Sequence, residues 1–89
     1  MFYNQNLLPD AIINYRKAID ADNSNPLYWS NLAVAYDAAY NYPLALSSIE
    51  KAIDLNKDSE VYQTMKLEIE KRKEEFEKLK SWFWLVYLI

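Results

Sequence analysis

Lys17-Ala18-Ile19-Asp20 returns unchanged 34 residues later as Lys51-Ala52-Ile53-Asp54, and Pro9-Asp10-Ala11-Ile12 has its counterpart in Pro43-Leu44-Ala45-Leu46. A fixed period of roughly 20 to 50 residues is typical of chains that stack similar supersecondary units, because one unit cannot bury its own apolar face. The repeat therefore predicts a solenoid. In such a stack we expect function to reside in an exposed surface.

Composition excludes several classes of function. The chain has 89 residues, a net charge of −3, no cysteine and no histidine. Disulfides, thiolate metal sites, cysteine nucleophiles and imidazole acid–base chemistry are thus all excluded. We expect no enzyme activity, no cofactor and no metal site. A basic field that would hold nucleic acid is also missing.

The glycine and proline content of the sequence predicts an all-α chain. It contains no glycine, and its three prolines, Pro9, Pro26 and Pro43, each stand where a helix is expected to begin. Asn23-Ser24-Asn25 precedes the second of these starts and supplies residue types that cap helices well. The apolar residues after each proline follow at helical spacing: Ile12, Tyr15 and Ile19; Trp29, Leu32 and Tyr36; Leu46, Ile49 and Ile53.

One stretch resembles a known family. The residues that carry the resemblance are Trp29, Leu32, Ala33, Tyr36, Ala45, Ile49 and Ala52. Their spacing is similar to that of the 34-residue tetratricopeptide repeat, a helix–turn–helix in which large and small residues interlock. Tyr40 departs from the family pattern, because the turn between the two helices often has glycine there. The resemblance implies a non-catalytic module for protein–protein interaction.

This resemblance divides the chain into four parts. Residues 1–24 correspond to the second helix of a preceding repeat, and residues 25–57 to a complete repeat. Residues 58–80 form a charged amphipathic capping helix, and residues 81–89 an apolar tail. The predicted fold is an all-α, solenoid-like fragment of antiparallel helix pairs closed by a long C-terminal helix.

The capping helix carries a heptad seam, which supports an alternative function. Opposite charges lie four residues apart along it, as in Lys66/Glu70, Glu68/Arg72 and Glu74/Lys78. The seam is interrupted at Arg72 and otherwise apolar, with Met65, Ile69, Phe76 and Leu79 among its members. The alternative is a homodimer that associates through this seam as a coiled coil.

The tail is apolar on every side of a helix. Its aromatic and aliphatic residues include Trp82, Phe83, Trp84, Leu85 and Tyr87. The run is less than half of the about 20 residues that span a bilayer, but lysines precede it as they do at a cytoplasmic membrane boundary. Three interpretations remain open: a truncated membrane anchor, a seam for a partner helix, or a plug that folds back onto the repeats.

The tetratricopeptide resemblance also implies where a ligand would lie, namely against the first helix of the complete repeat. The candidate residues there are Leu27, Ser30, Asn31, Val34, Asp37 and Ala38. Two tyrosines that border the turn complete the candidate set: Tyr40 and Tyr42. We expect Asp37 to set the charge preference of this surface.

The sequence therefore predicts a scaffold or adaptor that binds a protein or peptide in its groove. A chain that starts with Met1-Phe2-Tyr3 before asparagine and glutamine shows no signal peptide. We expect a cytoplasmic location, with the apolar tail at the cytoplasmic face of a membrane.

Overall fold

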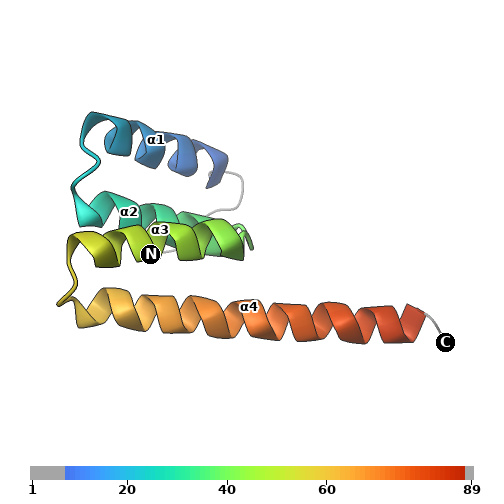
Figure 1. Ribbon diagram of the computed structural model, residues 1–89. Coiled ribbons are helices and arrows are strands. Elements are labelled where there is room, and N and C mark those ends of the chain that lie inside the picture. Colours follow the sequence, from blue (N-terminus) through green and yellow to red (C-terminus); the bar gives the residue numbers. More distant parts are fainter. Residues whose placement is uncertain (1–7, 88–89) are drawn as a thin grey trace.

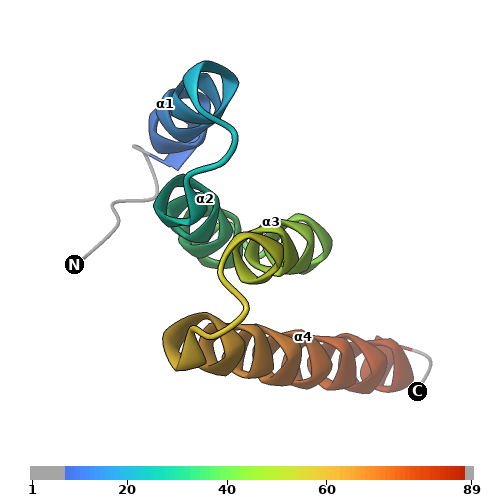
Figure 2. The same cartoon turned by 60° about the vertical axis from the view of Figure 1, so that its left-hand side comes forward.

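The computed structural model describes residues 8–87, and this part of the chain consists of four helices without a strand. The helices are α1 (Leu8–Ala21), α2 (Pro26–Ala38), α3 (Tyr42–Leu55) and α4 (Glu60–Tyr87). Successive helices run antiparallel, and each packs chiefly on its neighbours in sequence (Figure 1). In the turned view α1 and α4 lie at opposite ends of the stack (Figure 2). The predicted all-α, repeat-like fold is confirmed.

The helices start where the sequence predicts. Asn25 caps α2, because its side-chain oxygen accepts a hydrogen bond from the amide of Leu27 at 3.0 Å. Asn41 caps α3 in the same way, and each of these two helices has a proline in its first two positions. Ser59 accepts a hydrogen bond from the amide of Tyr62 at the start of α4.

The core is built from large side chains set against alanines. Ala33, Ala45 and Ala52 are completely buried, which allows neighbouring helices to approach closely. The other buried members of the core are Ile19, Leu32, Tyr36, Tyr42, Ile49 and Ile69. Trp29 packs partly buried against them, and its indole N–H donates to the carbonyl of Asn23 at 2.9 Å.

The turn between α2 and α3 places Tyr40 in the left-handed region, with φ of 61°. The amide of Tyr40 donates to the carbonyl of Asp37, and the amide of Asn41 to the carbonyl of Tyr36. These two bonds form a Schellman motif, in which the left-handed position usually holds glycine. A tyrosine therefore occupies a position at which a side chain raises the backbone energy.

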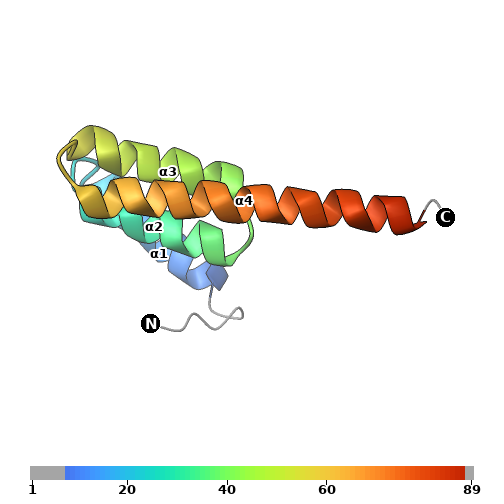
Figure 3. The same ribbon diagram turned by 90° about the horizontal axis from the view of Figure 1, so that it is seen from below.

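Helix α4 is twice as long as α3, with 28 residues against 14. At 1.5 Å per residue, these lengths correspond to about 42 and 21 Å. Figure 3 shows α4 lying along the body and then extending far beyond it. The predicted capping helix and the described part of the apolar tail are thus one continuous helix.

Among the described residues, α4 packs on the body from its start as far as Phe76. Ile69 is buried in the core, and Tyr62 and Met65 are partly buried against it. Phe76 contacts Tyr42 at the start of α3. Met65, Ile69 and Phe76, three members of the predicted dimerisation seam, are therefore already in contact with their own chain.

Candidate functional site

The predicted ligand-binding face of α2 is partly accessible. Leu27 is exposed, and Asn31, Val34 and Ala38 are half-buried. Leu27, Asn31, Val34 and Ala38 follow one another at steps of three or four, so they share one side of the helix. We call these four residues the α2 face.

Two candidate residues are not available at the surface. Ser30 is only 4% exposed, and its hydroxyl donates to the carbonyl of Leu27 within the same helix. Tyr42 is 6% exposed, because it lies in the first turn of α3 beneath Phe76. Burial, followed by the nearby charge of Asp37, raises the pKa of the Tyr42 hydroxyl. The Tyr42 ring thus contributes mainly to the core rather than to an open surface.

Asp37 is occupied by a partner from its own chain. Arg72 of α4 donates from Nε to Oδ1 of Asp37 at 3.0 Å and from Nη2 to Oδ2, a bidentate pair. This hydrogen bonding raises the pKa of Arg72. The residue that interrupts the heptad seam thus ties α4 to α2, and Asp37 presents no free carboxylate to a ligand.

An aromatic cluster surrounds the point at which α4 leaves the body. Tyr40 stacks on Phe76 with 6.2 Å between ring centroids, and Tyr42 meets the same ring edge-on at 5.6 Å. Lys80 lies over Phe76 at 5.6 Å. These four residues, which we call the aromatic clasp, orient α4 before it extends into solvent.

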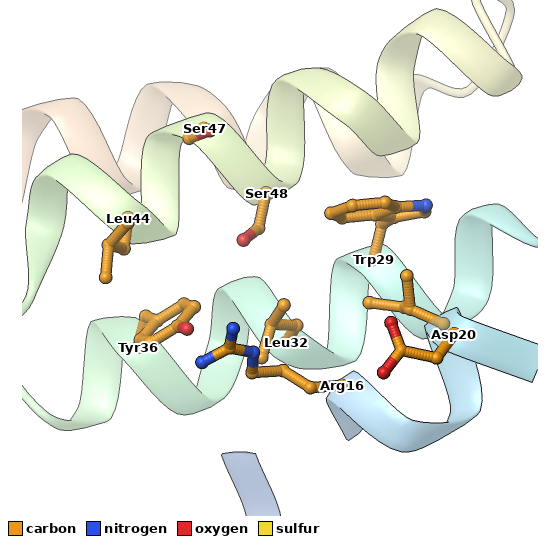
Figure 4. A pocket seen from close by; sticks show the side chains of 9 residues that line it. Arg16, Asp20, Trp29, Leu32, Tyr36, Leu44, Ser47 and Ser48 are labelled. Carbon is orange, nitrogen blue, oxygen red and sulfur yellow. The ribbon is translucent and has the colours of Figure 1, made fainter. Parts of the chain in front are cut away.

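A groove on the other side of α2 was not predicted. It has a volume of about 510 Å³ and crosses three helices, with α2 at its floor and α1 and α3 as walls (Figure 4). We call it the α1–α3 groove. It is lined by Arg16, Ile19, Asp20, Trp29, Leu32, Tyr36, Leu44, Ser47 and Ser48.

The α1–α3 groove combines an apolar floor with a polar rim. Leu32 and the ring of Tyr36 lie at the floor, and the Ser48 hydroxyl points into the space between the helices (Figure 4). Arg16 extends toward Tyr36, whereas Asp20 lies on the Trp29 side. Within residues 8–87 neither charge forms an ion pair. The rim therefore offers one free cation and one free anion, a turn apart.

The repeat itself contains the signal that marks this groove. Glu50 occupies in the second copy the position that Arg16 occupies in the first. Glu50 pairs with Lys66 of α4 at 3.4 Å, so the chain satisfies that charge internally. Arg16 has the opposite sign and stays free. A comparison of charges between equivalent repeat positions would have drawn attention to it.

Helix α4 ends in a bare apolar segment. Leu79, Trp82, Phe83, Trp84, Leu85, Val86 and Tyr87 are all exposed. No helix within the described residues is long and apolar enough to cross a membrane. The same residues contain no group of three or more acidic side chains arranged to hold a metal ion.

Comparison with known proteins supports the repeat assignment. The family model described as TPR repeat matches residues 1–38, an interval that includes α1 and α2. Comparisons with curated proteins and with solved structures gave no match. Together with the helical stack, the family match confirms the tetratricopeptide resemblance. Repeats of this kind are typically non-catalytic modules for protein–protein interaction.

Proposed function

We propose that this protein is a non-catalytic adaptor that binds a segment of a partner protein in the α1–α3 groove. The observation that carries the proposal is the groove itself, with its apolar floor and its free Arg16 and Asp20. Peptide sites commonly combine a buried apolar centre with a polar rim that fixes orientation. The match to the TPR repeat over α1 and α2 agrees with this class of function.

The groove defines the chemistry of its partner. An apolar side chain of the partner fills the space above Leu32 and Tyr36. A carboxylate of the partner pairs with Arg16, and a cation pairs with Asp20. Such charge pairs at a rim contribute mainly to orientation and to the association rate. The preferred partner is therefore an amphipathic segment with both signs of charge.

The α2 face is a second location for the same function. Leu27 supplies exposed apolar area there, while Asn31 and Val34 remain partly accessible. This face offers less charge discrimination than the groove, because Arg72 neutralises Asp37. The two surfaces lie on different sides of α2, so point substitutions separate them.

We place the adaptor in the cytoplasm, beside a membrane that its tail contacts. The alternative, a coiled-coil homodimer, has less support because Ile69 is buried in the protein's own core. A second copy would reach Ile69 only if α4 left the body. Leu79 and the tail remain exposed for either kind of contact.

The test starts with selection of 12-residue peptides from a random phage library on the immobilised full chain. Affinities of a selected peptide are then measured by fluorescence anisotropy. We expect Arg16→Glu to weaken binding at least tenfold, because a favourable rim charge becomes repulsive. Lys17→Glu, the matched control on the next residue of α1, changes the affinity less than twofold.

Leu27→Glu tests the second location. If the partner lies in the α1–α3 groove, this substitution leaves the affinity within twofold of the wild type. Loss of binding in Leu27→Glu with full binding in Arg16→Glu would assign the partner to the α2 face. A library that yields no peptide above background contradicts the proposed function.

A further inference from the structure

We infer that the exposed apolar segment of α4, residues 82–87, inserts into the surface of an anionic lipid bilayer, with the helix axis pointing at the membrane rather than lying flat. This inference rests on the membrane-proximal part of the proposed function and is independent of the α1–α3 groove. It names the lipid class, the inserted residues and the orientation of the protein.

The distribution of apolar residues around α4 favours a lipid over a protein partner. Two hollows lie on different sides of this helix end. One is lined by Lys80, Phe83, Trp84 and Tyr87. The other is lined mainly by polar residues with Trp82 and Leu85. A partner helix covers one side, whereas hydrocarbon surrounds an inserted helix completely, so a bilayer covers Trp82 and Leu85 together with the apolar residues of the first hollow.

The described apolar residues reach far enough to enter one leaflet. Residues 82–87 span about 9 Å at the rise of an α-helix. One leaflet contributes about 15 Å of hydrocarbon. An α4 whose axis points at the membrane thus brings residues 82–87 into one leaflet. Trp82 and Trp84 lie at its start, where an indole can remain at the headgroup level.

The charge distribution selects anionic lipid. Residues 71–80 carry five cationic and three anionic side chains, whereas residues 1–70 carry five cationic and ten anionic ones. Lys78 and Lys80 lie directly before the apolar segment, within reach of lipid headgroups. The acidic body is repelled by the same surface. Both effects favour an orientation in which α4 points at the membrane and the body is held away from it.

The geometry of α4 makes that orientation accessible. Phe76, a member of the aromatic clasp, is the last residue of α4 with a ring contact to the body. Trp82 follows six residues later, or about 9 Å along the axis. Figures 1 and 3 show that this part of α4 stands clear of the other helices. The helix can therefore enter a bilayer without rearrangement of the repeat.

The experiment is flotation of the full-length protein with vesicles of phosphatidylcholine alone or with 30 mol% phosphatidylglycerol. Leu85→Asp is compared with Leu67→Asp, a matched control on the same helix. These leucines are 62% and 66% exposed, so neither substitution disturbs the core. We expect Leu85→Asp to reduce the vesicle-bound fraction at least tenfold and Leu67→Asp to leave it unchanged.

A second pair of variants tests the lipid class. Lys78→Gln with Lys80→Gln is expected to reduce binding to the anionic vesicles at least fivefold. The control, Lys51→Gln with Lys57→Gln, removes the same charge from the body and does not reduce binding. Equal binding of the wild type to both vesicle types would overturn the assignment to anionic lipid.

Sedimentation of the same proteins without lipid identifies the competing occupant. A wild type that fails to bind vesicles and instead forms a dimer that Leu85→Asp dissociates would show that the tail packs on a second copy of the chain. That result would contradict the inference. A failure of the lipid inference does not change the peptide affinities expected for the groove variants. Conversely, Arg16→Glu is expected to lose peptide binding and keep vesicle binding, so the two proposals fail separately.

Discussion

Tyr40 holds a backbone conformation that most side chains disfavour, and its ring supplies the compensation. The left-handed region costs an L-residue roughly 1–2 kcal/mol relative to the right-handed one. The ring of Tyr40 stacks on Phe76, and an aromatic pair contributes about 0.5–1.5 kcal/mol beyond its buried area. The two effects are similar in size. A single residue thus links the turn after α2 to the direction of α4.

Substitution of Tyr40 separates these two effects. Tyr40→Gly and Tyr40→Ala both lose the ring, but only glycine relieves the backbone, so we expect the glycine variant to be more stable by about 0.5–1 kcal/mol. Urea denaturation followed by circular dichroism measures the difference. Ala39→Gly, at the neighbouring residue with φ of −87°, is the control and is expected to destabilise. An alanine variant as stable as the glycine variant would contradict the argument.

Helix α4 has two halves with different roles. Its first half completes the core through Ile69, while Arg72 attaches it to α2. Its last residues extend beyond the body and remain exposed. The first part of α4 therefore resembles a capping helix, whereas its last described residues remain accessible to another molecule.

Stability measurements can distinguish the two halves. We expect Ile69→Ala to destabilise the protein by about 2–5 kcal/mol, because it leaves a cavity in a tightly packed core. Truncation after Lys80 is expected to change the unfolding free energy by less than about 0.5 kcal/mol, as for a surface change. Leu67→Ala is the exposed control. A truncation as destabilising as Ile69→Ala would mean that the tail packs on the body.

The sequence predicts where the helices start and where they approach one another closely. Pro26 and Pro43 set helix starts, and the alanines at repeat positions mark close approach. Ion pairing was harder to predict, because it depends on which helices become neighbours. The expected Glu74/Lys78 pair forms at 3.3 Å. Arg72, in contrast, pairs across to α2, which only the fold reveals.

The candidate site was less predictable than the helices. The sequence indicates which side of α2 is free only after the positions of α1 and α4 are known. Ser30 and Tyr42 are candidate binding residues by sequence, yet the packing of the stack buries both. The α1–α3 groove escaped prediction because its lining comes from three helices, and no single stretch of sequence contains it.

The whole molecule is a short linear array, in which each helix is stabilised mainly by its immediate neighbours. Helices α2 and α3 each have a neighbour on both sides. In contrast, α1 packs on α2 within the described residues and leaves Ile13 exposed. The end of α4 has no neighbour at all in that part of the chain. Such an array opens from its ends, because local stability follows the local density of buried contacts.

Hydrogen exchange monitored by mass spectrometry tests this gradient along the chain. We expect the slowest exchange in α2 and α3 around Ala33 and Ile49, faster exchange in α1, and the fastest in α4 beyond Phe76. Anionic vesicles should slow exchange selectively beyond Phe76, because insertion desolvates only that part of α4. A groove-binding peptide should instead slow α1, since it contacts Arg16 and Asp20 of that helix. Uniform exchange across all four helices would show that the molecule opens as one cooperative unit, contrary to a stack stabilised by nearest neighbours.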